Sequence, residues 1–128
     1  MEASPIRILI VDDEFSVLLS LGTYFENRGF DVLAVEDAEK ALEKLQKETV
    51  DVAIVDMRLP GMDGETLILK AHEIQPSLKF LIYTGSPKYS MSPALGNIGI
   101  TEEYFFRKPV PDLKFLAQAI DRILKREQ

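Results

Sequence analysis

The chain has 128 residues, of which 46% are hydrophobic and 28% are charged, and its formal net charge is −6. These values fit one domain, residues 1–128 with a core at about 6–126. The absence of cysteine excludes disulfides and thiolate metal sites. The acidic balance argues against nucleic-acid binding. No apolar run is long enough to span a membrane, and the N-terminus lacks a basic signal segment, so we expect a cytoplasmic protein.

Short apolar runs alternate with amphipathic stretches along the chain. The apolar runs predict five strands, at residues 6–11, 31–35, 50–56, 79–84 and 104–107. Apolar residues at helical spacing predict helices at 15–28, from 38 onward behind an N-cap at Asp37, at 65–74 and at 112–126. This alternation predicts an α/β fold, (βα)5 and doubly wound, in which helices cover both faces of a parallel sheet.

The order of the strands decides where a site can form. Right-handed crossovers leave few topologies for five parallel strands, and we expect the flavodoxin-like order 2-1-3-4-5. This order places the C-terminal ends of the first and third strands side by side. Ligands bind at such a switch point in open α/β sheets.

One segment departs from the alternation of strands and helices. The pattern calls for a fourth helix between Thr84 and the fifth strand, but the residues there are poor helix formers. Residues 85–103 contain Pro87, Pro93, Gly96 and Gly99, which disfavour a helix interior. We therefore predict an irregular or shortened fourth helix, opening at Ser92 with Pro93 at its first position.

Three carboxylates stand at strand ends, Asp12 and Asp13 after the first strand and Asp56 after the third. The predicted strand order brings them into one crevice, where each like charge raises the pKa of the others. Mg²⁺ prefers oxygen ligands and keeps open positions for a phosphoryl oxygen. The pattern therefore predicts a Mg²⁺ site.

Asp56 also has the character of a nucleophile, because it ends an almost entirely apolar strand. Thr84 and Lys108 end the fourth and fifth strands on the same rim and offer a hydroxyl and an ammonium group to a phosphoryl group. The peptide between Lys108 and Pro109 is a candidate cis bond. Each residue alone is more typical of a turn, a cap or a solvated loop. Together, on one rim, they favour phosphoryl chemistry.

Four blocks of sequence now resemble a known family. They are Val11-Asp12-Asp13-Glu14, the run from Val55 to Gly64, Tyr83-Thr84-Gly85 and Arg107-Lys108-Pro109. These blocks resemble the signature of response-regulator receiver domains, in order and over nearly the whole chain. The resemblance implies transfer of a phosphoryl group from a histidine kinase or a phosphotransfer protein, and a downstream effector that the sequence does not identify. It implies a signalling phosphoacceptor that assists its own phosphorylation and dephosphorylation.

The resemblance also implies roles for particular residues. Asp56 is the acceptor, Asp13 binds Mg²⁺ directly, Asp12 acts through water, and the backbone carbonyl of Arg58 completes the protein ligands.

Around the phosphoryl group, the resemblance implies that Thr84 and Lys108 bind its oxygens. Phe105 is the aromatic residue that swings inward after phosphorylation, although core packing explains it equally well. Arg58 and Ser86 are candidates for tuning the rates. The Arg58 guanidinium is a candidate partner of Glu14 or of the phosphoryl group, and a solvated loop arginine is the alternative.

The family often dimerises or docks partners through its fourth helix, fifth strand and fifth helix. Because we expect an irregular fourth helix, we predict that this surface is remodelled. A homodimer is a candidate assembly, but the usual dimer of the family is not assumed. Phe115 is expected to lie off the inward face of the last helix, and His72 on the surface of the third.

Three alternatives remain. An acid-nucleophile phosphatase usually has a second Asp two residues after the nucleophile, where this chain has Arg58. A flavin-binding protein would need a loop rich in Ser, Thr and Gly after the first strand, where Asp12 and Asp13 would repel a phosphate. A pseudo-receiver that is never phosphorylated is slightly favoured by the irregular fourth helix. The complete acidic, threonine and lysine set disfavours it.

Overall fold

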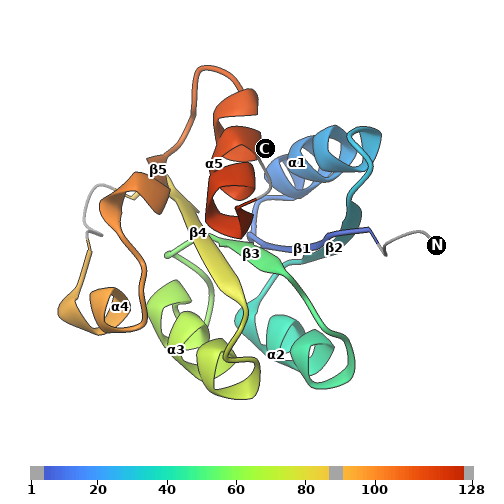
Figure 1. The fold of residues 1–128 in the computed structure, drawn as a ribbon. Helices are drawn as coiled ribbons and strands as arrows, with labels where there is room; N and C mark the ends of the chain where they lie inside the picture. Colours follow the sequence, from blue (N-terminus) through green and yellow to red (C-terminus); the bar gives the residue numbers. More distant parts are fainter. Residues whose placement is uncertain (1–4, 87–90, 126–128) are drawn as a thin grey trace.

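The computed structural model describes residues 5–86 and 91–125, and its centre is a five-stranded parallel sheet (Figure 1). The strand order is β2-β1-β3-β4-β5, as predicted. The strands are β1 (Arg7–Val11), β2 (Asp31–Val35), β3 (Val52–Val55), β4 (Lys79–Thr84) and β5 (Phe105–Arg107). Because all strands run the same way, their C-terminal ends share one rim.

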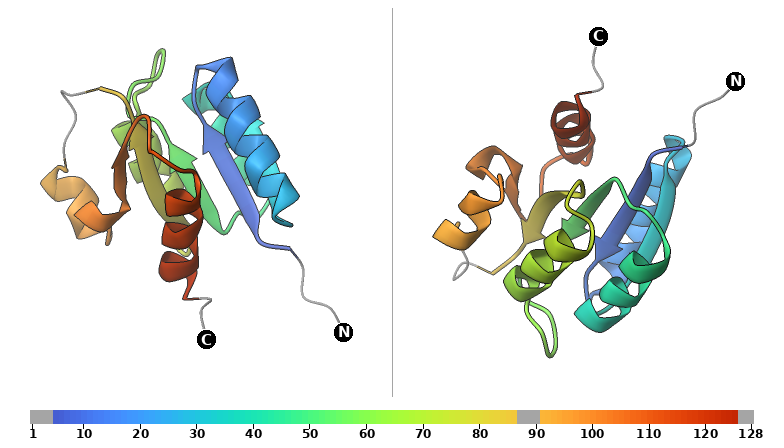
Figure 2. Two further views of the ribbon diagram at one scale, coloured as in Figure 1. Left: turned by 90° about the horizontal axis from the view of Figure 1, so that it is seen from above. Right: turned by 60° about the horizontal axis from the view of Figure 1, so that its bottom comes forward.

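Helices cover both faces of the sheet, α1 and α5 on one side and α2 and α3 on the other (Figures 1 and 2). The helices are α1 (Phe15–Asn27), α2 (Ala38–Lys47), α3 (Gly64–Ile74), α4 (Pro93–Asn97) and α5 (Lys114–Leu124), and a 3-10 turn spans Glu102–Tyr104. Alternate strand residues face opposite helical layers: Ile8 and Ile10 pack with α1 and α5, whereas Leu9 and Val11 pack with α2 and α3.

The predicted boundaries differ from the observed ones by up to two residues. The third strand is shorter than predicted, so Asp56 follows β3 rather than ending it. The last helix begins at Lys114, because Asp112 and Leu113 form the turn before it. Asp37 caps α2 as predicted, since its carboxylate accepts a hydrogen bond from the Lys40 backbone N–H.

The fourth helix is short, as predicted. It has five residues, with Pro93 in its first turn, and the Ser92 hydroxyl accepts a hydrogen bond from the Leu95 N–H. Leu95 is completely buried and holds this turn against the core formed with α2 and α3. Gly99 follows with a φ of +100°, a conformation that favours glycine. Residues 87–90, which carry Pro87, lie outside the described residues.

Gly64 brings the start of α3 against the segment that follows β3. A Cβ atom added at Gly64 would lie 2.4 Å from the Asp56 carbonyl oxygen and 2.6 Å from the Met57 Cα. The Gly64 N–H donates to the Met57 carbonyl, and Asp63 caps the helix through the Thr66 N–H. This close approach fixes the backbone around Asp56.

Within residues 5–86 and 91–125, no helix combines the length and the apolar character that crossing a membrane requires.

Candidate functional site

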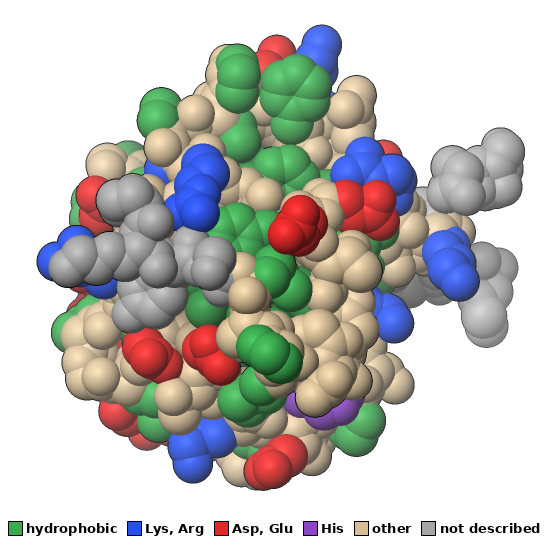
Figure 3. Space-filling view, turned by 90° about the vertical axis from the view of Figure 1, so that its left-hand side faces the viewer, with side chains coloured by type: hydrophobic (Ala, Val, Ile, Leu, Met, Phe, Trp, Pro, Cys, Tyr) green, Lys and Arg blue, Asp and Glu red, His purple; other side chains and the backbone are tan. Residues whose placement is uncertain are grey.

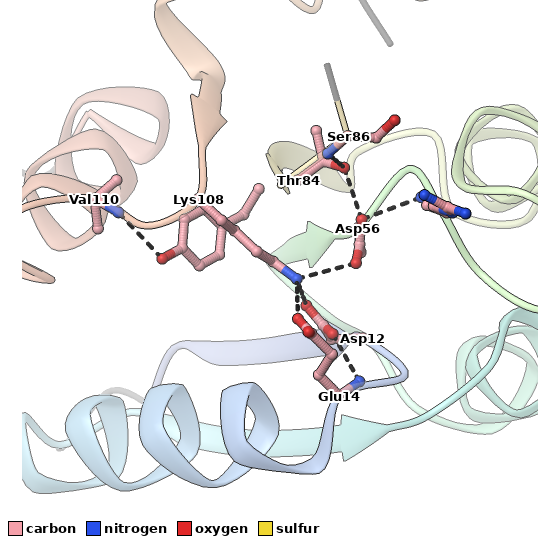
Figure 4. Close-up of polar contacts among 9 residues, drawn as sticks. Asp12, Glu14, Asp56, Thr84, Ser86, Lys108 and Val110 are labelled. Atoms are coloured by element: carbon pink, nitrogen blue, oxygen red, sulfur yellow. Dashed lines mark hydrogen bonds and ion pairs between the residues drawn. The ribbon is translucent and has the colours of Figure 1, made fainter. Parts of the chain in front are cut away.

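Five predicted site residues meet on the C-terminal rim of the sheet, and Figure 4 shows four of them, Asp12, Asp56, Thr84 and Lys108. Asp12 and Asp13 follow β1, Asp56 follows β3, Thr84 ends β4 and Lys108 follows β5. The strand register causes this convergence, because the last residues of β1 and β3, Val11 and Val55, are direct partners.

The carboxylates of Asp12, Asp13 and Asp56 form a compact cluster. One oxygen from each lies within 4.8 Å of the others. Asp12 is 2% exposed and Asp56 is 5% exposed, whereas Asp13 is exposed. Burial raises the pKa of Asp12, and the Asp56 charge adds to this, against the opposing effect of Lys108. The cluster therefore holds negative charge where the fold disfavours it.

Lys108 supplies the positive charge for this cluster. Its Nζ lies 2.7 Å from Asp12 Oδ2, 2.9 Å from Glu14 Oε1 and 3.0 Å from Asp56 Oδ2. Burial lowers the pKa of Lys108, but its hydrogen bonds to the three carboxylates outweigh burial and leave the pKa above its ordinary value. The ammonium group is therefore charged, and it bridges the strands that carry the acidic residues.

The carboxylate of Asp56 is held by donors from three directions. The Thr84 hydroxyl donates to Oδ1 at 2.8 Å, and the Arg58 N–H donates to the same oxygen at 3.1 Å. Lys108 contacts Oδ2. Ser86 lies behind Thr84, because its N–H donates to the Thr84 hydroxyl at 3.4 Å. These donors orient Asp56 and are the kinds of group that bind phosphoryl oxygens.

An open crevice of about 610 Å³ lies beside Asp56. Its lining includes Asp13, Arg58, Gly85, Ser86 and Lys108. An opening of this kind gives a reacting group from another molecule access to a carboxylate that is itself almost buried.

The sequence did not identify Tyr83 as part of the site. Its ring centroid lies 5.8 Å from Lys108 Nζ, and its hydroxyl accepts a hydrogen bond from the Val110 N–H at 3.4 Å. The Lys108–Pro109 peptide between these contacts is cis, as predicted. The sequence held one indication of where Tyr83 lies. Side chains alternate along a strand, so Tyr83 points to the opposite side of the sheet from Thr84, toward α1 and α5.

The residues present fit a Mg²⁺ ion. The cluster offers carboxylate oxygens from two strand ends, the hard ligands that Mg²⁺ prefers. Arg58 lies beside Asp56, joined through its N–H, so its carbonyl remains a predicted ligand.

The predicted pair of Arg58 and Glu14 is absent from the ion pairs of the described residues, because Glu14 contacts Lys108 instead. Phe105 is half-buried against the core on the α2 and α3 side, a position compatible with both of its predicted roles. Phe115 is 40% exposed and lies off the inward face of α5, as predicted. His72 lies on α3, partly exposed.

Comparisons with known proteins agree with this geometry. The model of the response regulator receiver domain family matches residues 8–121. A receiver domain protein from Methanospirillum hungatei JF-1 has a similar structure, with a TM-score of 0.80 and 31% identity, covering 97% of this chain and 100% of that one. Sporulation initiation phosphotransferase F of Bacillus subtilis is 27% identical over 92% of this chain and 93% of its own.

Transcriptional regulatory protein GlrR of Escherichia coli is 32% identical over 98% of this chain. This chain spans only 28% of the length of that relative. The family match covers well over half of the residues, and the predicted strand order is the one observed. The chain belongs to the response regulator receiver domains of two-component systems.

Proposed function

We propose that Asp56 accepts a phosphoryl group from a phosphohistidine and that the resulting aspartyl phosphate switches a surface for a downstream effector. The observation that carries this proposal is the environment of Asp56. Its carboxylate is almost buried, faces an open crevice, and is held by Thr84, Arg58 and Lys108 beside two further carboxylates. The donor would be a histidine kinase or a phosphotransfer protein.

In the transfer, an Asp56 carboxylate oxygen forms a bond to phosphorus as the bond from phosphorus to the donor imidazole nitrogen breaks. The electron pair stays on the imidazole, which takes a proton from solvent. Such a reaction depends on positioning and charge neutralisation more than on covalent help from the protein. Asp12, Asp13, Asp56 and the Arg58 carbonyl would hold Mg²⁺, which supplies positive charge to the phosphoryl oxygens when bound.

Two groups that hold Asp56 have a second role after transfer. The Thr84 hydroxyl and the Lys108 ammonium already donate to the two Asp56 oxygens. We propose that they donate to phosphoryl oxygens once the acyl phosphate has formed. Hydrolysis by water then releases inorganic phosphate and returns Asp56 to a carboxylate. Arg58 and Ser86 line the crevice beside Asp56 and are the candidates for tuning the rate of that step. Asp56 thus carries a phosphoryl group until water removes it, and the chain acts as a signalling phosphoacceptor rather than as an enzyme that converts a substrate.

The short α4 favours one alternative, a pseudo-receiver that binds partners without phosphorylation. The cluster of Asp12, Asp13 and Asp56 argues against this alternative. Burial disfavours the ionised form of Asp12, and a protein that is never phosphorylated would have no use for such an unfavourable charge. The cytoplasmic location and the remodelling of the usual dimer surface stay predictions.

Intact mass measured after incubation with Mg²⁺ and acetyl phosphate tests the proposal. Wild type should gain one phosphoryl group and Asp56→Asn should gain none, because an amide cannot form the acyl phosphate. Asp51→Asn is the matched control, since Asp51 precedes the same strand at its other end and should leave phosphorylation intact. If wild type gains nothing while a separate titration shows Mg²⁺ binding, the pseudo-receiver is the better description.

A further inference from the structure

The side chain of Arg107 joins two segments that are far apart in the sequence. Its guanidinium donates from Nη1 to the carbonyl oxygen of Ser86, in the segment after β4. The same guanidinium lies over the ring of Phe105, with 5.0 Å between Cζ and the ring centroid. Arg107 and Phe105 are two residues apart on β5, so their side chains leave the same face of the sheet.

Ser86 connects this arginine to the acceptor. Its N–H donates to the Thr84 hydroxyl at 3.4 Å, and that hydroxyl donates to Asp56 Oδ1 at 2.8 Å. Ser86 is 7% exposed, and its peptide groups are thus bonded toward Asp56 on one side and toward Arg107 on the other. A continuous series of contacts therefore runs from the Asp56 carboxylate to the Phe105 ring.

We infer that Arg107 is a positioning residue that couples the location of the Phe105 ring to the state of Asp56. This inference rests on the proposed function, because it needs Thr84 to exchange Asp56 for a phosphoryl oxygen. When the Thr84 hydroxyl turns, the Ser86 N–H loses its hydrogen bond to that hydroxyl, and the Ser86 carbonyl moves relative to β5. The guanidinium follows the Ser86 carbonyl and leaves its place over the ring, and Phe105 is released from its present position.

The guanidinium group suits this role better than other side chains do. It is planar and carries five N–H donors in a fixed arrangement, so one face can cover an aromatic ring while an edge donates to a carbonyl. An ammonium group is a compact charge without such a plane, so Lys at this position would satisfy one contact at the expense of the other.

Phe105 lies where a released ring would change the protein surface. It is half-buried against the core on the α2 and α3 side, and it lines a shallow hollow together with Met91, Glu102 and Arg107. On the side of the molecule that carries α4 and β5, hydrophobic side chains gather at the centre of the surface among charged ones (Figure 3). A change in the Phe105 position therefore alters an apolar area that partners can reach.

The chain offers a matched control in Arg122. Its guanidinium also lies over an aromatic ring, 5.9 Å from the centroid of Tyr104. Tyr104 packs toward α1 and α5, on the other side of the sheet from Phe105. Removing Arg122 thus removes a contact of the same kind beside β5, without the link through Ser86.

Nuclear magnetic resonance of ring-labelled phenylalanine tests the inference, with the Phe105 signal assigned from a Phe105→Leu variant. Each protein is measured free and with Mg²⁺ plus beryllofluoride, a phosphoryl mimic whose binding is followed by its own fluorine signal. In wild type and Arg122→Ala the Phe105 signal should move on binding. In Arg107→Ala the movement should fall at least about twofold, because the free protein already samples the released position. Arg107→Lys should lie between the two.

Equal movement of the Phe105 signal in wild type and Arg107→Ala, with beryllofluoride bound to both, would overturn the inference and leave the proposed function standing. No beryllofluoride binding by wild type would instead refute the proposed function, and the coupling with it. Should Arg107→Ala fail to give the dispersed amide spectrum of a folded protein, Arg107→Lys decides alone, since unchanged movement there contradicts the role of the planar group.

Discussion

The two ends of the sheet use acidic residues in opposite ways. At the C-terminal rim, Asp12 and Asp56 are nearly buried close to one another and share one lysine. At the N-terminal end, Arg7 also contacts several acidic residues, but these are exposed or half-exposed: Nε lies 2.8 Å from Asp31 Oδ2, Nη1 lies 3.3 Å from Glu48 Oε1, and the backbone N–H donates to Asp51.

Both ends place Asp beside the end of a strand, so the residue type does not set the role. Carboxylates at the N-terminal end are exposed or half-exposed and contact Arg7 in the presence of solvent, which makes them neutral or favourable for folding. Carboxylates at the C-terminal end converge, and the fold disfavours the charge of Asp12. The comparison indicates that the N-terminal end contributes to stability, whereas the C-terminal end carries the proposed reaction site at some expense of stability.

The largest effect on stability is expected from Gln75, at the N-terminal end of the sheet. Its side chain accepts a hydrogen bond from the Val50 N–H and donates to the carbonyls of Leu45 and Glu48. It thus joins the end of α2, the start of β3 and the end of α3. Gln75→Ala leaves these buried or half-buried groups without their partner, and should lower the free energy of unfolding by about 2 kcal/mol.

Urea unfolding followed by circular dichroism measures this loss, with Gln46→Ala as the control. Gln46 is exposed on α2, where alanine is a good helix former, so that variant should match wild type. Phosphorylation of Asp56 should be unchanged in both variants. A loss for Gln75→Ala no greater than for Gln46→Ala would show that water replaces the three hydrogen bonds.

The next effect has the opposite sign and belongs to the other end of the sheet. Asp12→Asn should raise the free energy of unfolding by about 1 kcal/mol in the presence of a chelator, because it removes a charge that burial disfavours. Lys108 keeps Asp56 and Glu14 as partners. Addition of Mg²⁺ should raise the free energy of unfolding less in Asp12→Asn than in wild type, because the variant has lost a carboxylate that is a predicted Mg²⁺ ligand.

The dependence on pH sharpens this test. The pKa of Asp12 is raised in the folded protein, so this group favours folding at low pH, and its contribution is lost as pH rises through the folded pKa. The advantage of Asp12→Asn should therefore shrink as pH falls through the raised folded pKa of Asp12, and it should be lost below pH ~4, the ordinary range of an Asp carboxyl. A variant that is less stable than wild type at neutral pH would show that the contact with Lys108 outweighs burial.

The sequence predicted the fold better than it predicted the side-chain contacts, for a physical reason. Strand order and the common rim follow from backbone topology and from the alternation of apolar runs, and these two features are enough to place Asp56, Thr84 and Lys108 together. The partners of long side chains depend on rotamers and on neighbours from distant segments. Glu14 therefore meets Lys108 and not Arg58.

The contacts of Arg107 and Tyr83 were missed for a related reason. Each contact joins a strand residue to the segment that follows the neighbouring strand: Arg107 on β5 contacts Ser86 after β4, and Tyr83 on β4 contacts Val110 after β5. Local spacing carries no information about such a contact, whereas strand alternation at least gives the side of the sheet. Functional residues at strand ends are thus easier to predict than the residues that position them.

The smallest effect is expected from Asp31, the counterpart of Asp12 at the N-terminal end. Its ion pair with Arg7 is partly exposed, with side-chain exposures of 41% and 33%, so solvent and salt weaken it. Asp31→Asn should lower the melting temperature by only about 1–3 °C at low ionic strength, and the difference should vanish at about 1 M salt. Differential scanning calorimetry at both salt concentrations measures this. A loss that persists in high salt would mean that Asp31 acts through a hydrogen bond that solvent does not reach, and the contrast between the two ends of the sheet would then lie in packing rather than in charge.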